Sequence, residues 1–210
     1  MVRRLGLGTA PLQTPQSGER PMLYLVRHGQ SVWNVQQRTQ GQTVHPALTE
    51  LGRRQAGAAA GAVAADLERA GLVATLLLCS DLVRAVQTAQ IVGARLSLAP
   101  RQDRRLREQA LGRLEGMDNI AARAAVADVD WSDPEVAIGG GESARQVFDR
   151  MADVLGPITG MNAIVVSHGD AIRYALGWLA GHHAADCPWH NIGPGAVFAV
   201  GADAPARLLD

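Results

Sequence analysis

Three short apolar runs limit the possible folds most strongly, because each one stops abruptly at polar residues and is followed by a helical pattern. The runs cover residues 22–26, 74–79 and 163–167. Runs of this length rich in Leu, Val and Ile are typical of buried strands, and strands that alternate with helices indicate a mostly parallel sheet. We therefore expect an α/β protein, a three-layer α/β/α sandwich in which residues 196–200 add an antiparallel edge strand.

The segment between the first two runs predicts the longest helix. Thr49 is its expected N-cap, and Gly71 is expected to end it. Between them, apolar residues recur at the spacing of one helix face, namely Ala56, Ala59, Ala60, Val63, Ala64 and Leu67. Further helices are expected after residue 80, at 118–127, at 143–155 and from 169 to 179, and a short strand is expected at 96–99.

The length of the chain favours one domain. A chain of 210 residues buries one sizeable α/β core, so we expect a single catalytic domain at residues 21–210. Residues 1–20 have neither helical nor strand periodicity and predict a flexible lead-in. No apolar run approaches the ~20 residues that span a bilayer, and the start lacks the apolar core of a secretory signal. We expect a cytoplasmic protein without a membrane partner.

Composition excludes several classes of function. The chain has 20 basic and 20 acidic residues, so it lacks the positive excess expected of a nucleic-acid binder. All the basic residues are arginine, which excludes the lysine of P-loop enzymes and Schiff-base catalysis. Cys79 and Cys187 match neither a metal site nor a CxxC motif, and we expect no disulfide framework.

The three apolar runs all end close to residues suited to bind an oxyanion. Arg27 and His28 follow the first run, Arg84 lies one turn into the helix after the second, and His168 follows the third. Parallel strands bring their carboxyl ends to one edge of a sheet, where ligands of such folds bind. Two guanidinium and two imidazole groups there indicate a site for phosphate. Since no cluster of residues has metal-ligand spacing, we expect no metal and no cofactor.

Six motifs in order carry a family resemblance. They are Leu25-Val26-Arg27-His28-Gly29-Gln30-Ser31 with Asn34, Leu48-Thr49-Glu50-Leu51-Gly52, Ser80-Asp81-Leu82-Val83-Arg84-Ala85 with Gln87-Thr88-Ala89, Leu106-Arg107-Glu108 with Gly112 and Glu115-Gly116, Gly140-Gly141-Glu142-Ser143, and Ser167-His168-Gly169. Together they resemble the histidine phosphatase superfamily, in the branch of cofactor-dependent phosphoglycerate mutases and related small phosphatases. The matches run from residue 22 to about 173.

The resemblance implies a role for each matching residue. His28 would be the nucleophile that forms a phosphohistidine, and Glu108 the general acid and base. The phosphoryl oxygens would be held by Arg27, Arg84 and His168, with help from Asn34, and Gln40 and Gly41 would bind the substrate. The implied activity is metal-independent hydrolysis of small phosphomonoesters, so the partner would be a small phosphorylated metabolite. The oligomeric state is not predicted, although a homodimer is compatible with the sequence.

Two other functions remain open at this stage. One is a cofactor-dependent phosphoglycerate mutase, which is disfavoured because Gln109 follows Glu108 where the mutases have arginine, and because the chain is short for a mutase. The other is a silent module that binds phosphorylated ligands without turnover. Retention of both His28 and Glu108 argues against it. Taken alone, Glu108 would be interpreted as a solvated carboxylate beside Arg101, Arg104, Arg105 and Arg107.

Overall fold

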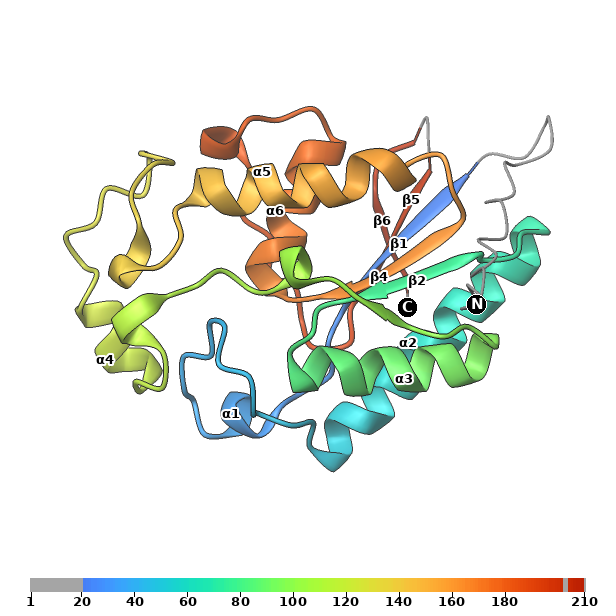
Figure 1. The fold of residues 1–210 in the computed structure, drawn as a ribbon, viewed down its shortest axis with the longest axis horizontal. Coiled ribbons are helices and arrows are strands. Elements are labelled where there is room, and N and C mark those ends of the chain that lie inside the picture. Colours follow the sequence, from blue (N-terminus) through green and yellow to red (C-terminus); the bar gives the residue numbers. More distant parts are fainter. Residues whose placement is uncertain (1–20, 202–203, 210) are drawn as a thin grey trace, which may run out of the picture.

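The computed structural model describes residues 21–201 and 204–209 (Figure 1). The expected lead-in at 1–20 lies outside these residues. Within the described ranges, six strands form one sheet in the order β3-β2-β4-β1-β5-β6. They are β1 (Met22–Arg27), β2 (Leu76–Cys79), β3 (Arg101–Gln102), β4 (Ala163–Ser167), β5 (Val197–Gly201) and β6 (Arg207–Leu209). The helices are α1 (Val32–Val35), α2 (Glu50–Ala70), α3 (Val83–Leu96), α4 (Asn119–Ala124), α5 (Ala144–Leu155) and α6 (Gly169–Leu179).

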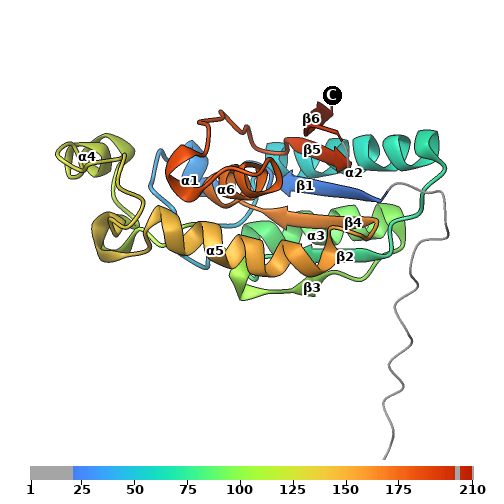
Figure 2. The same ribbon diagram turned by 90° about the horizontal axis from the view of Figure 1, so that it is seen from above.

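The predicted three-layer sandwich is confirmed. Side chains of successive strand residues point to opposite faces, so β1 and β4 contribute alternately to two apolar clusters. Leu23 and Leu25 pack with residues of α5 and α6 on one face. Tyr24 and Val26 pack with residues of α2 and α3 on the other face. Figures 1 and 2 show the two helix pairs on either side of the sheet.

Hydrogen-bond pairing confirms a mostly parallel sheet with an antiparallel edge. Strands β1, β2, β3 and β4 run parallel to one another. Strand β5 pairs antiparallel with β1, and β6 pairs antiparallel with β5. The expected strand at 196–200 therefore exists as β5, but its placement at the edge was wrong, because β6 lies outside it.

Local signals predicted several boundaries correctly. Thr49 caps α2 through its side chain, which accepts a hydrogen bond from the Gly52 amide (3.0 Å), and Gly71 ends the helix with a positive φ of 68°. Ser143 caps α5 in a reciprocal pair with Gln146. Helix α4 is shorter than the predicted 118–127.

The strand predicted at 96–99 was wrong. Leu96 ends α3, and Ser97 follows it in the left-handed region at φ 57°. The real strand, β3, consists of two exposed residues, Arg101 and Gln102. Two exposed polar residues carry no apolar signal, and they form a strand only because β2 is there to pair with them.

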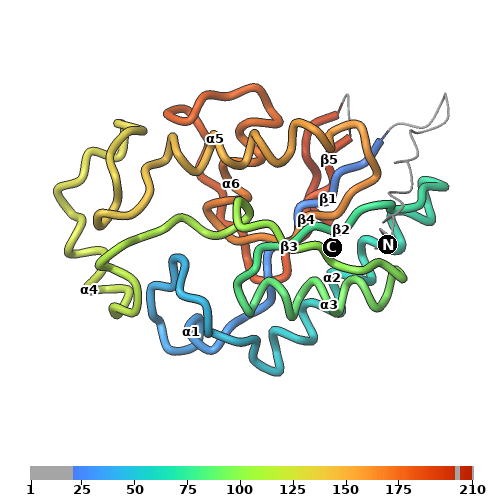
Figure 3. The backbone as a smooth tube through the Cα atoms, viewed as in Figure 1, coloured from blue at the N-terminus to red at the C-terminus, as the bar shows by residue number. Residues whose placement is uncertain are grey.

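Between β3 and α5 the chain leaves the sheet, as Figure 3 shows, and builds a lobe around α4. A third, small apolar cluster lies here, around Leu114, Ala122, Val126 and Ile138. Across the described ranges, no helix is long and apolar enough to cross a membrane.

Candidate active site

The carboxyl ends of the central strands meet in one cleft of about 800 Å³. His28 follows β1 and His168 follows β4, and because these strands are neighbours the two imidazole rings meet edge to face with centroids 5.0 Å apart. His168 lies fully buried against His28. The other predicted site residues line the cleft, namely Arg27, His28, Asn34, Gln40, Gly41, Arg84 and Glu108.

The ring of His28 is held in one orientation by its neighbours. Its Nδ1 lies 2.7 Å from the carbonyl oxygen of Gly29. A carbonyl only accepts hydrogen bonds, so Nδ1 carries the proton and the lone pair is on Nε2. Burial, reinforced by the positive charges of Arg84 and Arg27, lowers the pKa of His28 well below its ordinary 6.5. The imidazole is therefore neutral at pH 7, as a nucleophile must be.

Two glycines allow the loop after β1 to pass close to the start of α2. A Cβ at Gly29 would lie 2.1 Å from the carbonyl oxygen of Gly52, and a Cβ at Gly52 would lie 2.0 Å from the carbonyl oxygen of Gln30. The amide of Gly29 also donates to the hydroxyl of Thr88 in α3 (3.2 Å). The loop that carries His28 is thus fixed to two helices at once.

Arg84 is fully buried and held by backbone carbonyls. Its Nη1 donates to the carbonyl of Thr43 and its Nη2 to that of Gly41, both at 2.8 Å. Burial lowers the pKa of Arg84 to about 10, which still leaves the group charged at pH 7. The carbonyl of Gly41, a residue predicted to bind substrate, therefore orients this guanidinium, which is a contact that the sequence did not reveal.

Within residues 21–201 and 204–209, several buried nitrogens around the cleft have no hydrogen-bond partner in the protein. They are the Nε atoms of Arg27, Arg84 and Arg173 and both ring nitrogens of His168. The Nε of Arg173 lies 3.5 Å from the carboxylate of Asp170. Arg27 is otherwise held by a hydrogen bond from its Nη1 to the carbonyl of Ile192. Burial and the charge of Arg84 lower the pKa of His168 well below 6.5. Because an unpaired buried polar group is costly, this arrangement is typical of a site that an oxyanion completes.

Asn34 in α1 and Gln40 in the segment after α1 both line the cleft. The Oδ1 of Asn34 accepts a hydrogen bond from the amide of Ser31 (2.9 Å), and the Oε1 of Gln40 accepts one from the hydroxyl of Ser31 (2.7 Å). Since both oxygens are engaged, the NH₂ groups are the parts available to a ligand. Both side chains can therefore donate hydrogen bonds to phosphoryl oxygens.

Glu108 lies at the N-terminus of α6, inside the cleft rather than on the solvated face that its sequence context suggested. Its carboxylate accepts hydrogen bonds from the amides of Ala171 (3.1 Å), Asp170 (3.3 Å) and Gln109 (3.0 Å). Helix N-termini favour negative charge, which holds the carboxylate there. Burial and the adjacent Glu108 raise the pKa of Asp170 to about 6.

The arginines near Glu108 divide into two kinds. Arg104 and Arg105 are more than half exposed, as expected of a solvated face. Arg107 instead forms a bidentate ion pair with Asp81, with both N–O distances at 2.6 Å, and its side chain is 17% exposed. This pair joins the segment before Glu108 to the end of β2.

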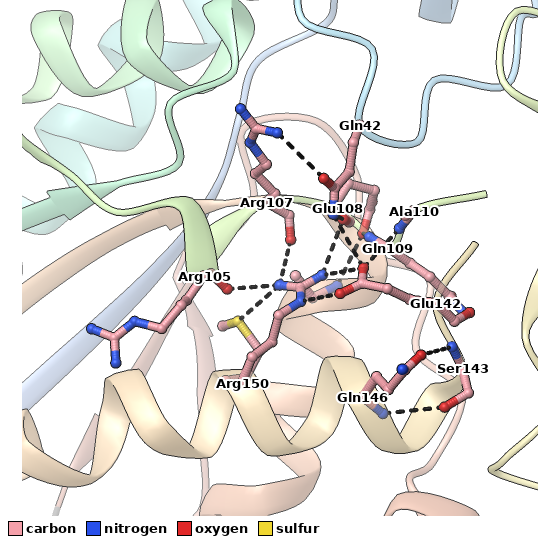
Figure 4. A network of polar contacts seen from close by, with 12 residues as sticks. Gln42, Arg105, Arg107, Glu108, Gln109, Ala110, Glu142, Ser143, Gln146 and Arg150 are labelled. Carbon is pink, nitrogen blue, oxygen red and sulfur yellow. Dashed lines mark hydrogen bonds and ion pairs between the residues drawn. The ribbon is translucent and has the colours of Figure 1, made fainter. Parts of the chain in front are cut away.

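A second set of contacts, made by Arg150 and Glu142, also holds the Glu108 segment (Figure 4). We call it the Arg150 clamp, and it was not predicted from the sequence. Arg150 of α5 binds the Glu142 carboxylate through two hydrogen bonds, at 2.8 and 3.0 Å. Its guanidinium also donates to the carbonyls of Arg105, Arg107 and Glu108, at 2.7 to 3.0 Å. The available signal was an arginine on the apolar face of α5, three residues after Val147 and four before Val154.

Residues 21–201 and 204–209 contain no group of three or more His, Cys, Asp or Glu side chains that could hold a metal ion. The positive charge of the cleft comes instead from guanidinium groups. Such a cleft can bind a phosphoryl group and present a neutral imidazole nitrogen to it.

Comparison with known proteins agrees with this geometry. The chain is 35% identical over 171 residues to a probable phosphoglycerate mutase of Yersinia pestis, and the match covers 76% of this chain and 74% of the relative. A solved mycobacterial hydrolase superposes with a TM-score of 0.77 at 29% identity, covering 90% of this chain and 97% of the other. A mycobacterial glucosyl-3-phosphoglycerate phosphatase in complex with VO3 superposes with a TM-score of 0.75 at 31% identity and the same coverage.

The model of the histidine phosphatase superfamily (branch 1) matches residues 23–206, which includes every residue of the cleft described above. Members of this superfamily are phosphatases or mutases that act on small phosphorylated substrates. With nearly the whole chain matched, this protein belongs to the histidine phosphatase superfamily, branch 1.

Proposed function

We propose that this chain is a phosphoric monoester hydrolase that works through a phosphohistidine at His28. The observation that carries the proposal is the free Nε2 of His28 beside unpartnered buried nitrogens of Arg27, Arg84 and His168. A phosphoryl group needs donors around its three equatorial oxygens and a nucleophile in line with the leaving group. The cleft supplies both kinds of group.

In the first step, the lone pair on Nε2 of His28 attacks phosphorus, and the bond between phosphorus and the ester oxygen breaks. The departing alkoxide takes a proton from the carboxyl group of Glu108. The guanidinium groups of Arg27 and Arg84 stabilise the charge on the equatorial oxygens. The products are the free alcohol and a phosphohistidine.

In the second step, water attacks the phosphorus and gives its proton to the Glu108 carboxylate. The bond between phosphorus and Nε2 breaks, and its electron pair returns to the imidazole of His28. Phosphate leaves, and Glu108 holds a proton again for the next substrate. One carboxyl thus serves as acid and then as base.

Hydrolysis is favoured over mutase action by the residue after Glu108. Gln109 is buried, and its amide donates to the carbonyl of Glu142 (2.8 Å), so its side chain braces the loop. A mutase must retain its phosphoryl group and exclude water until a second substrate binds. The cleft of about 800 Å³ has room for water beside a small substrate. The similarity to a probable phosphoglycerate mutase keeps that activity as the alternative.

The two activities are separated by one pair of assays. Phosphate release from nitrophenyl phosphate and from 3-phosphoglycerate measures hydrolysis. Conversion of 3-phosphoglycerate to 2-phosphoglycerate, with and without 2,3-bisphosphoglycerate, measures mutase action. We expect phosphate release that bisphosphoglycerate does not stimulate. Rapid conversion of 3-phosphoglycerate that depends on bisphosphoglycerate would identify a mutase. If neither hydrolysis nor mutase action is detected, the result would favour the binding module.

A further inference from the structure

The cleft is much larger than a phosphoryl group requires. Arg27, His28 and Arg84 occupy its inner end, yet its volume is about 800 Å³, in the range of pockets that enclose large ligands. The additional space extends toward the lobe around α4, which Figures 1 and 2 show beyond the end of the sheet. We call this part the outer cleft. It is lined by Leu111, Leu114, Val126, Trp131, Val136 and Trp189.

One wall of the outer cleft is aliphatic. The third apolar cluster contains eight side chains, and six of them line the cleft. The cluster is separate from the two that cover the sheet. Its side chains therefore pack together on one side and face the cleft on the other. The apolar part of a ligand would bury this surface, at a gain of about 25 cal/mol per Å².

A second wall carries planar side chains that lie close to one another. The guanidinium carbon of Arg173 lies 4.0 Å from the ring centroid of Tyr174 and 5.2 Å from that of Trp189. Trp189 is 77% exposed, and Trp131 is 66% exposed. Large aromatic side chains exposed beside a cleft commonly mark a binding surface.

Charge in the outer part of the cleft is balanced, in contrast to the inner end. Arg38 and Arg123 line it together with Asp130 and Asp133, and Arg173 pairs with Asp170 (3.5 Å), which lies beside Glu108 nearer the inner end. A site built for a second anionic group would have an excess of positive charge. The lining instead favours a leaving group that is large and mostly uncharged.

On the basis of the hydrolase function proposed above, we propose that the substrate is a phosphomonoester of a large alcohol with an extended apolar or planar part. The phosphoryl group binds at the inner end, and the alcohol part lies between the aliphatic wall and Trp189. A three-carbon phosphoglycerate would leave both walls uncovered.

A series of straight-chain alkyl phosphates, from ethyl to octyl, tests this assignment. The alcohols have nearly the same leaving-group ability, so only size and apolar area change along the series. We expect kcat/KM to rise about two- to fourfold per methylene until the outer cleft is filled. The octyl ester should exceed 3-phosphoglycerate by at least about a hundredfold. No rise with chain length, or a preference for 3-phosphoglycerate, would overturn the proposal.

Variants then test which surface contacts the alkyl chain. Val126→Thr and Val136→Thr keep the branched shape of the aliphatic wall but add a hydroxyl group, so the rise per methylene should become smaller. Ile120→Thr makes the same kind of change at a residue of α4 that is 80% exposed and does not line the cleft. This control should keep the wild-type slope. Equal slopes in all variants would overturn the assignment of this wall.

Alkylphosphonates, which cannot be hydrolysed, keep this proposal separate from the proposed reaction. Their dissociation constants, measured by calorimetry, should decrease along the same series. A decrease without turnover of any ester would leave the binding proposal standing and reject the hydrolase. Turnover of nitrophenyl phosphate, combined with dissociation constants that do not change along the phosphonate series, would support the hydrolase and reject the binding proposal.

Discussion

At the scale of single residues, the reactivity of His28 is set by one hydrogen bond. The Gly29 carbonyl fixes the proton on Nδ1, and this leaves Nε2 free beside the buried cations. The same cations that attract phosphate also keep the imidazole neutral. Binding and nucleophilicity therefore depend on the same pair of arginines.

Replacing Arg84 tests this dependence. Arg84→Met keeps most of the buried stem but removes the guanidinium group, and we expect kcat/KM to fall at least about a hundredfold, or roughly 3 kcal/mol. Arg53→Met, an exposed position on α2, is the control and should change little. A loss below about threefold in a folded Arg84 variant, judged by circular dichroism, would remove this residue from the phosphate site.

The two buried histidines also predict how stability depends on pH. Below their ordinary pKa of 6.5, the unfolded chain takes up protons on His28 and His168 that the folded chain does not bind. The free energy of unfolding should therefore fall as pH decreases from 7 to 5. Asp170 has the opposite effect on stability. The fold raises its pKa to about 6, so in this pH range the folded chain takes up one proton there that the unfolded chain does not bind.

In His168→Asn, only His28 lowers the stability as pH decreases, and Asp170 offsets that effect. The free energy of unfolding of this variant should therefore decline much less with decreasing pH than that of wild type. Urea denaturation at several pH values in phosphate-free buffer measures both slopes. Equal slopes for wild type and variant would mean that His168 is charged in the folded protein.

At the scale of secondary-structure elements, close packing between α2 and the loop after β1 requires glycine. Gly52→Ala would place a methyl group 2.0 Å from the Gln30 carbonyl oxygen, so we expect destabilisation by roughly 1–3 kcal/mol. Gly57→Ala in the same helix meets nothing within 4 Å and should stabilise by about 0.4–1 kcal/mol. Chemical denaturation measures both changes, and similar values for the two variants would contradict the close approach.

The Arg150 clamp predicts a defect confined to acid catalysis. Arg150→Met frees the Glu108 segment, so hydrolysis of an alkyl phosphate, which needs a proton donor, should slow at least about tenfold more than hydrolysis of nitrophenyl phosphate. Glu142→Gln should act in the same direction, and the double variant should be little worse than Arg150→Met because both residues belong to one network. Measurements of kcat/KM for the two esters supply the comparison.

Arg145→Met is the matched control for this clamp, because Arg145 lies on the same helix and pairs with the exposed Glu135. It should keep the wild-type ratio of the two rates. If Arg150→Met slows both esters equally, the clamp only supports the fold. If Glu108→Gln slows hydrolysis of the two esters equally, the assignment of Glu108 as the general acid is rejected.

At the scale of the whole molecule, the sequence predicted the features that local patterns determine. Buried strands with both faces covered appear as continuous apolar runs. Thr49 indicates the start of α2, because its side chain caps the helix. The order of β5 and β6 could not be predicted, because it depends on pairing between distant segments. The cleft residues at strand ends followed from the parallel topology. Arg150 was missed because its carbonyl partners lie more than 40 residues away along the chain.

The most direct test of the account is detection of the covalent intermediate. Glu108→Gln should form the phosphoenzyme with nitrophenyl phosphate, which needs little help from an acid, and should hydrolyse it slowly. We predict a burst of nitrophenol close to one equivalent per chain, with peptide mapping by mass spectrometry after an alkaline quench locating an acid-labile phosphoryl group on His28. Phosphoryl label on another residue, or turnover retained by His28→Ala, would contradict the account.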